Sequence, residues 1–116
     1  MKSINLEERP WGRFYIIHED SSYKLKRIEV DPGGRLSYQY HHKRSEAWTI
    51  VEGGGLITLN GEEKEYFKGE TIVIPKGVKH RIENNRKEKV VFIEVQTGTY
   101  FGEDDIVRIE DDYDRV

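Results

Sequence analysis

Hydrophobic and polar residues alternate with a period of two along much of this chain. The clearest runs are residues 35–41, 47–51 and 91–96, in which a large aliphatic or aromatic residue occupies every second position. Alternation over short runs rich in β-branched and aromatic residues is typical of β-strands. We find no helical pattern of ten or more residues and expect only a short helical turn around residues 104–111.

Turn-forming sequences separate these runs, as expected when strands are short. They are Asp31-Pro32-Gly33-Gly34, Gly53-Gly54-Gly55, Asn60-Gly61, Pro75-Lys76-Gly77 and Asn84-Asn85. Asn60-Gly61 lies between residues 55–59 and 62–67 and predicts a two-residue hairpin. Roughly nine or ten short strands then predict an all-β chain, arranged as a sandwich, a jelly roll or a small barrel.

Length and composition limit the number of domains, the possible site chemistry and the location of the protein. A chain of 116 residues is expected to form a single domain, residues 1–116. It contains no cysteine, which excludes disulfides, thiolate metal sites and cysteine nucleophiles. No apolar run reaches the length of a membrane span, and the segment Met1–Glu8 is too polar for a signal peptide. We therefore expect a soluble cytoplasmic protein without a membrane partner.

Charge is unevenly distributed around a net value of −3. Residues 103–116 contain seven acidic residues and two arginines, whereas the remaining residues contain 17 bases and 15 acids. Such a chain has no basic face suited to nucleic acid, so we expect no nucleic-acid partner. From charge alone, the acidic end is expected to be a solvated surface segment.

One run places four polar side chains on the same expected strand face. Arg35, Ser37, Gln39 and His41 share parity, because residues two apart in a strand point the same way. From this strand alone, the row faces either water or an interior site. Glu46, which follows His41 after four intervening residues, and His80 in a separate run are further possible ligands.

Two spaced motifs carry these residues. The first is G-x5-H-x-H-x4-E-x6-G, whose fixed positions are occupied by Gly33, Gln39, His41, Glu46 and Gly53. The second is G-x5-P-x-G-x2-H-x3-N, whose fixed positions are occupied by Gly69, Pro75, Gly77, His80 and Asn84. Nine of the ten positions are identical, and the single departure is Gln39 in place of a histidine. The chain thus resembles the cupin superfamily.

This resemblance implies a double-stranded β-helix, or jelly-roll barrel, with one divalent metal ion inside. It implies Gln39, His41, Glu46 and His80 as the metal ligands. Zinc is the leading candidate, and manganese, cobalt, nickel and iron are alternatives, because imidazole and oxygen ligands suit all of these ions. The departure at Gln39 leaves open a cupin barrel that has lost its metal.

A narrower resemblance extends over nearly the whole chain. Arg9-Pro10-Trp11-Gly12, Glu46-Ala47-Trp48 and residues 94–108 resemble type II phosphomannose isomerase, often the cupin half of a bifunctional enzyme with mannose-1-phosphate guanylyltransferase. Tyr40, Lys43, Ala47 and Asp114 depart from that pattern. The resemblance implies interconversion of mannose 6-phosphate and fructose 6-phosphate by an isomerase half without its guanylyltransferase partner. It also implies that the acidic end packs over the barrel or near its mouth.

Two alternatives remain open. His41, Glu46 and His80 alone would form the two-histidine, one-carboxylate set of an Fe(II)-dependent cupin oxygenase. The chain could also be a non-catalytic cupin that binds a sugar phosphate, because a fold does not fix a function.

An isomerase needs a group that moves a proton and groups that bind phosphate. Glu94 and Lys26 are the catalytic candidates; each could instead be a surface charge. His42 is disfavoured because it is adjacent to His41 and should point away from the metal. The candidates for substrate binding are Arg35, Ser37, Arg44, Trp48 and Arg108. We expect a hexose phosphate as substrate and a homodimer as the assembly.

Overall fold

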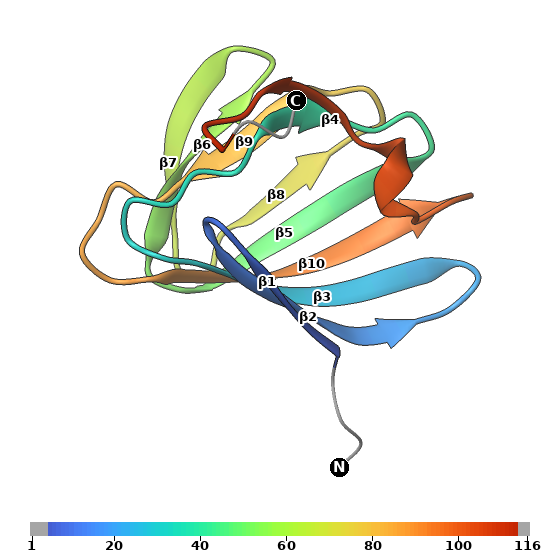
Figure 1. Cartoon of the computed structure of the whole chain (residues 1–116), viewed down its shortest axis with the longest axis horizontal. Coiled ribbons are helices and arrows are strands. Elements are labelled where there is room, and N and C mark those ends of the chain that lie inside the picture. The colour runs from blue at the N-terminus through green and yellow to red at the C-terminus, as the bar shows by residue number, and fades with distance from the viewer. Residues whose placement is uncertain (1–4, 114–116) are drawn as a thin grey trace.

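The computed structural model describes residues 5–113, and these form two antiparallel sheets that face each other (Figure 1). The six-stranded sheet has the order β1-β2-β3-β10-β5-β8, and the five-stranded sheet has the order β11-β4-β9-β6-β7. Met1–Ile4 and the departure at Asp114 lie outside the described residues.

The strands of the six-stranded sheet are β1 (Asn5–Arg9), β2 (Gly12–Glu19), β3 (Tyr23–Val30), β5 (Arg44–Glu52), β8 (Thr71–Ile74) and β10 (Val90–Gly98). Those of the other sheet are β4 (Tyr38–Tyr40), β6 (Gly54–Leu59), β7 (Glu62–Phe67), β9 (His80–Glu83) and β11 (Val107–Glu110). A single 3-10 turn, η1 (Glu103–Asp105), is the only helical element among the described residues. The all-β prediction is therefore confirmed.

Several local predictions are also confirmed. The hairpin at Asn60-Gly61 joins β6 to β7, and Asn60 adopts the positive φ of 47° that this turn requires. The short helical turn is present as η1, but residues 107–110 of the same predicted region form strand β11. This difference arises because Val107, Arg108 and Glu110 pair with β4, a long-range contact that local sequence does not encode.

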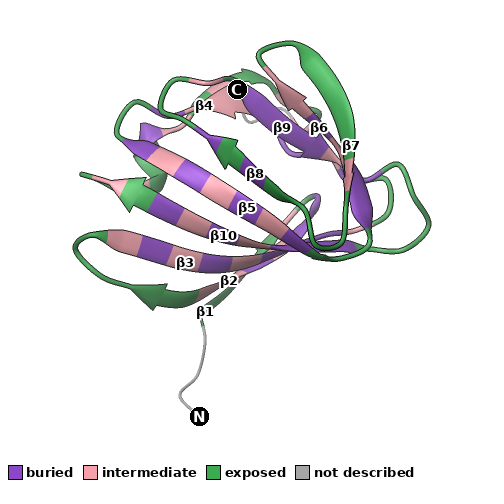
Figure 2. Ribbon diagram, turned by 180° about the vertical axis from the view of Figure 1, so that it is seen from behind, coloured by how far each residue is buried: buried purple, intermediate pink, exposed green. Residues whose placement is uncertain are grey.

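The alternating pattern translates into one buried and one partly exposed face on the central strands (Figure 2). On β5 the inward row is Arg44, Glu46, Trp48 and Ile50, and on β10 it includes Phe92, Glu94 and Gln96. The β5 row runs from polar to apolar and the β10 row from apolar to polar, and because the two strands are antiparallel their polar residues lie at the same end of the sheet. The apolar core therefore fills one part of the space between the sheets, and a polar interior occupies the other.

The run at residues 35–41 is less regular than predicted. Only Tyr38–Tyr40 form strand β4, whereas Arg35 makes an isolated bridge to Glu83. As a result Arg35 does not share a face with Gln39, and Leu36 is buried next to Ser37. The parity argument fails here because the chain is not continuously extended.

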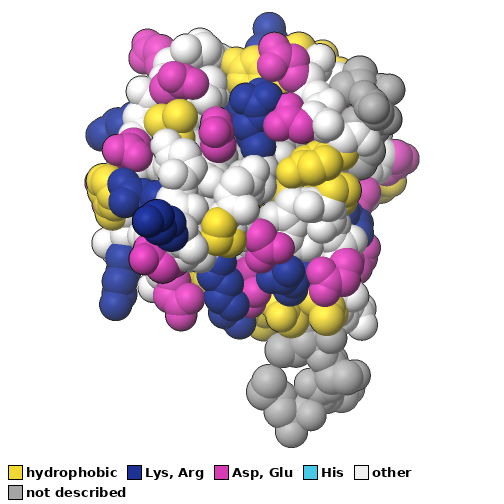
Figure 3. Space-filling view, turned by 60° about the vertical axis from the view of Figure 1, so that its left-hand side comes forward, with side chains coloured by type: hydrophobic (Ala, Val, Ile, Leu, Met, Phe, Trp, Pro, Cys, Tyr) yellow, Lys and Arg dark blue, Asp and Glu magenta, His cyan; other side chains and the backbone are white. Residues whose placement is uncertain are grey.

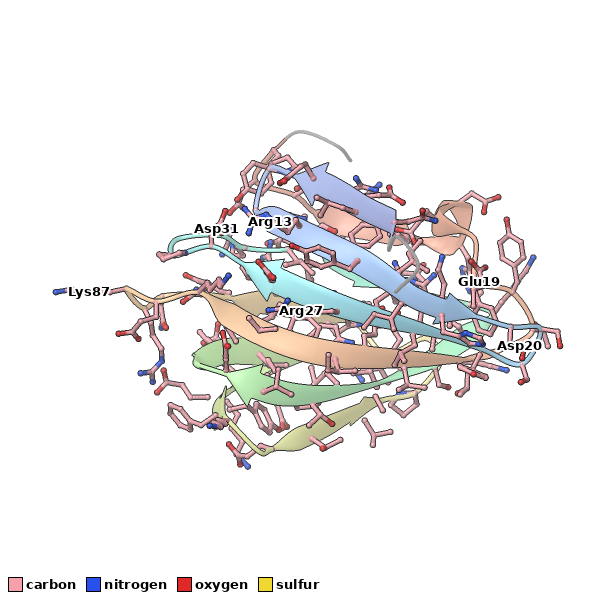
Figure 4. The ribbon with its side chains drawn as sticks, turned by 90° about the horizontal axis from the view of Figure 1, so that it is seen from below. Arg13, Glu19, Asp20, Arg27, Asp31 and Lys87 are labelled. Carbon is pink, nitrogen blue, oxygen red and sulfur yellow. The ribbon has the colours of Figure 1, made fainter. Side chains whose placement is uncertain are left out.

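The outer face of the six-stranded sheet carries a charge network of its own. Arg13 contacts Glu29 and Asp31 at 3.1 and 3.0 Å, and Arg27 contacts the second oxygen of Glu29 at 3.1 Å. Figure 4 shows Arg13, Arg27 and Asp31 on the outer surface of this sheet. On the face drawn in Figure 3, acidic and basic side chains are interspersed.

No helix in the described residues is long and apolar enough to cross a membrane.

Candidate metal and sugar-phosphate site

Three buried ligand candidates converge between the sheets. His41 follows β4, Glu46 lies on β5, and His80 begins β9; one nitrogen or oxygen atom of each lies within 4.8 Å of the others. The Nε2 atom of His41 is 3.1 Å from Oε2 of Glu46, and Nε2 of His80 is 3.8 Å from Oε1. This buried group could hold a metal ion.

Hydrogen bonds to backbone carbonyls orient both imidazoles. Nδ1 of His41 lies 3.1 Å from the carbonyl oxygen of Asp105, and Nδ1 of His80 lies 2.8 Å from that of Val78. A carbonyl oxygen only accepts, so Nδ1 of each ring carries a proton, and Nε2 is the nitrogen turned toward Glu46. Burial lowers the pKa of His80, and its Nε2 atom has no hydrogen-bond partner. Both features fit metal ligation, in which histidine is usually oriented through its other nitrogen.

Glu46 is held as a carboxylate by its neighbours. Burial alone would raise the pKa of Glu46, but the hydrogen bond with His41 and the neighbouring positive charge hold it well below its ordinary value. Nε of Arg44 donates to Oε2 at 2.9 Å, and Nε1 of Trp48 donates to Oε1 at 3.0 Å. The carboxylate is thus fixed in position and charge before any ligand arrives.

Arg44 lies where it would compete with a metal ion. Its guanidinium is buried, and its Nη2 atom lies 3.4 Å from Nε2 of His41, the nitrogen that a metal ion would use. A bound ion would have to replace this contact. The second terminal nitrogen of Arg44, Nη1, is buried without a hydrogen-bond partner.

Glu94 lies on β10, next to Lys26 of β3 and Trp48 of β5 in the sheet register. Its side chain is buried, and Oε1 accepts a 2.7 Å hydrogen bond from Nε2 of Gln96. Burial, followed by the negative charge of Glu46, raises the pKa of Glu94 to about 8. Glu94 and Glu46 are therefore a carboxyl pair in which one group is ionised and the other is protonated at neutral pH.

Lys26 is buried in the same region. Its Nζ atom lies 3.3 Å from Oε2 of Glu103 and 4.1 Å from the centre of the Phe14 ring. Lys26 and Glu94 line one cavity between the sheets, so the structure brings the two predicted catalytic residues together. The other residues lining this cavity are Arg9, Trp11, Phe14, Ile28, Leu36, Ser37, Gln39, Arg44, Glu103, Ile106 and Arg108.

Gln39 lines this cavity and is paired with His80 in the sheet register. Its amide oxygen accepts a hydrogen bond from the Ser37 hydroxyl. Its role as a fourth metal ligand stays a prediction, as does the role of Ser37 in substrate binding.

Two predicted substrate contacts lie elsewhere. Arg35 forms an exposed ion pair with Asp112, with Nη2 and Oδ1 2.6 Å apart, and lines a different groove with Tyr38 and Arg81. Trp48 is 1% exposed and stacks on Phe92 with ring centroids 4.5 Å apart. Trp48 therefore positions Glu46 through its indole hydrogen bond and packs in the core. Neither Arg35 nor Trp48 lines the cavity.

Sequence reasoning did not assign roles to two residues of η1. The carboxylate of Asp105 accepts the backbone N–H groups of His42 and Lys43 at 3.2 and 2.9 Å, and its carbonyl orients His41. Glu103 reaches Lys26 and lies 3.7 Å from Nη1 of Arg44. The only feature of the sequence that pointed to Asp105 or Glu103 was the expectation that the acidic end packs near the mouth of the barrel.

Comparison with known proteins places the chain in a sequence family. Residues 3–111 match the family model described as mannose-6-phosphate isomerase C-terminal. Mannose-1-phosphate guanylyltransferase ManC of Salmonella typhimurium is 47% identical over 108 residues, which are 93% of this chain and 22% of that protein. The chain thus spans under a quarter of the length of the curated relatives it matches.

Solved structures agree on the fold. The capsular polysaccharide assembling protein CapF of Staphylococcus aureus superimposes with a TM-score of 0.81 and 24% identity, over 96% of this chain and 34% of that one. The Cnp3 cupin domain of Schizosaccharomyces pombe superimposes with a TM-score of 0.71 and 19% identity, over 83% of this chain and 69% of that one. The predicted cupin fold, a double-stranded β-helix, is confirmed.

Proposed function

The chain belongs to the mannose-6-phosphate isomerase C-terminal family, and on that premise we propose that it is a metal-dependent isomerase of mannose 6-phosphate and fructose 6-phosphate. The observation that carries the proposal is the position of Glu94. A buried carboxyl group whose pKa is about 8 lies beside a His-Glu-His ligand set and in a cavity lined by cationic side chains. These groups could supply the base, the electrophile and the phosphate contacts of an aldose–ketose isomerase.

His41, Glu46 and His80 would hold the divalent ion, with zinc as the leading candidate. When bound, such an ion supplies Lewis-acid polarisation of the substrate carbonyl, which makes the adjacent C–H acidic. The Glu46 carboxylate is already held ionised, and the hydrogen bonds at Nδ1 of both histidines leave Nε2 as the nitrogen that would bind the ion.

Glu94 moves the proton. Its carboxylate form removes the proton from C2 of the open-chain aldose, and the C–H electron pair forms the C1–C2 double bond while the C1 oxygen takes up a proton. Glu94 then returns its proton to C1 while the C2 hydroxyl gives up its proton and becomes the ketone, so the proton lost by the C2 oxygen balances the one gained by the C1 oxygen. A pKa close to the working pH suits a group that must both accept and donate the same proton.

A coupled assay on mannose 6-phosphate tests this function. The chain is stripped with a chelator, reconstituted separately with zinc, manganese, cobalt or nickel, and assayed alongside the Glu94→Gln variant. We expect turnover with at least one metal and a fall of about 100-fold or more in kcat for Glu94→Gln. Background turnover with every metal would exclude the isomerase.

A second candidate is a non-catalytic sugar-phosphate-binding cupin. The observation in its favour is the contact between Arg44 and His41 Nε2, which places an internal cation at the nitrogen that a metal ion would bind. This reading predicts tight binding of mannose 6-phosphate to the chelated protein without turnover. Dependence of that binding on added metal would count against it, whereas oxygen uptake that requires Fe(II) would instead indicate an oxygenase.

A further inference from the structure

The cavity beside the ligand set is unusually rich in cations. Arg9, Lys26, Arg44 and Arg108 line it, against the two acids Glu94 and Glu103. Lys26 and Arg44 are 4% and 3% exposed. Buried lysine and arginine are rare unless they are paired, so the partners of these side chains show what the cavity is built to hold.

Two of the arginines have nitrogen atoms without hydrogen-bond acceptors. Nη1 of Arg44 and Nε of Arg108 are buried and have no hydrogen-bond partner. Arg108 lies opposite Gln39 in the pairing of β11 with β4, on the wall of the same cavity. A buried donor without an acceptor costs about 1–3 kcal/mol, and an anion with several oxygens would remove that cost at both arginines.

Glu103 holds the position between the cations. Its Oε2 atom lies 3.3 Å from Nζ of Lys26 and 3.7 Å from Nη1 of Arg44. Its side chain is 44% exposed and is carried on η1, a turn of three residues at the mouth, so it enters from the solvent side. One carboxylate oxygen thus contacts two buried cations that could accept a more highly charged group.

We infer that Lys26, Arg44 and Arg108 form the phosphate subsite, and that the Glu103 carboxylate occupies it until the phosphate of the substrate displaces it. A phosphate carries more charge than a carboxylate and offers three acceptor oxygens, so it can satisfy the donors that Glu103 leaves unpaired. A neutral sugar gains nothing from displacing Glu103. The subsite therefore selects phosphorylated ligands and assigns Lys26 to phosphate binding.

This inference rests on the proposed function only for the identity of the sugar. The phosphate subsite itself can be tested with inorganic phosphate. Isothermal titration of inorganic phosphate, mannose 6-phosphate and mannose is performed on the full chain and on Glu103→Gln. The matched control is Asp104→Asn, which removes the same charge one residue away, where the carboxylate accepts the Tyr100 hydroxyl at the surface. We expect Glu103→Gln to bind phosphate about three- to tenfold more tightly and the control to match the wild type.

Lys26→Met supplies the opposite test. Methionine fills the space beside Phe14 without a charge, and we expect phosphate affinity to fall by about thirtyfold or more. Lys64→Met, at an exposed position of β7, is the matched control and should leave the affinity unchanged. Circular dichroism confirms that each variant is folded.

The outcomes separate the subsite from the isomerase. Phosphate binding that weakens with Lys26→Met and strengthens with Glu103→Gln supports the subsite even if no isomerase activity is found. Isomerase activity with phosphate binding that ignores both substitutions would overturn the subsite and leave the proposed function standing. Equal affinity for mannose and mannose 6-phosphate would also overturn it.

Discussion

Replacing Glu94 with glutamine removes a titration from the interior with little change in side-chain shape. Glutamine imitates the protonated carboxyl group, and its oxygen can still accept the hydrogen bond from Gln96. The folded protein holds the Glu94 proton at pH values at which the unfolded chain has released it. The wild-type free energy of unfolding, measured relative to the variant, must therefore fall as pH rises from 4.5 to about 8.

The size of this effect follows from the pKa. The pKa of Glu94 is raised from 4.5 to about 8, and each pKa unit corresponds to ~1.4 kcal/mol. The full loss is up to ~5 kcal/mol, comparable to the whole stability of a small domain. Below pH 4.5 the two proteins should differ little, and above about pH 8 the variant should be the more stable.

Urea unfolding of the chelated protein, followed by tryptophan fluorescence, measures the difference. Trp11 and Trp48 are both buried and report on the core. Wild type, Glu94→Gln and the exposed control Glu62→Gln are compared across the range from mildly acidic to mildly alkaline pH. If the difference in the free energy of unfolding between wild type and Glu94→Gln stays constant with pH to within ~1 kcal/mol, the raised pKa of a buried Glu94 is refuted.

Three further predictions concern the framework of the site. His80→Ala should lower zinc or manganese affinity by at least about 100-fold, measured by competition with a chromophoric chelator, because it removes a buried imidazole whose Nε2 atom has no other partner. Asp105→Ala should destabilise the fold by about 2 kcal/mol and weaken metal binding about tenfold, because the carboxylate holds the two backbone N–H groups that follow His41; unchanged urea unfolding would contradict this. Gly98→Ala should destabilise by about 3 kcal/mol or more, seen as a lower Tm, because its Cβ atom would lie 2.2 Å from the carbonyl oxygen of Lys43.

Local sequence information predicted the features that depend on short-range geometry. The turn sequence Asn60-Gly61 predicted the β6–β7 hairpin, and the alternation on β5 places Glu46 and Trp48 on one buried face. The resemblance of two spaced motifs to those of cupins implied His41, Glu46 and His80 as potential ligands, and the folded chain brings them together.

Features that depend on distant contacts were not predictable in this way. Parity suggested that Arg35 shares a face with Gln39, but the regular strand covers only Tyr38–Tyr40. Lys26 and Glu103 are 77 residues apart in the chain and meet at the mouth, and no pattern within either segment encodes that contact. Trp48 could be predicted as inward-facing, whereas its bond to Glu46 became visible only with the side chains in place.

The measurement that tests the central claim most directly is turnover of mannose 6-phosphate as a function of bound metal. Wild type, chelated wild type and His80→Ala are titrated with zinc or manganese, and both the bound ion and fructose 6-phosphate are quantified. The proposed site predicts turnover that rises in proportion to bound metal and saturates when each chain holds a single ion. A chain that carries its metal yet converts no mannose 6-phosphate, or one that turns over equally after chelation, would contradict a metal-dependent isomerase.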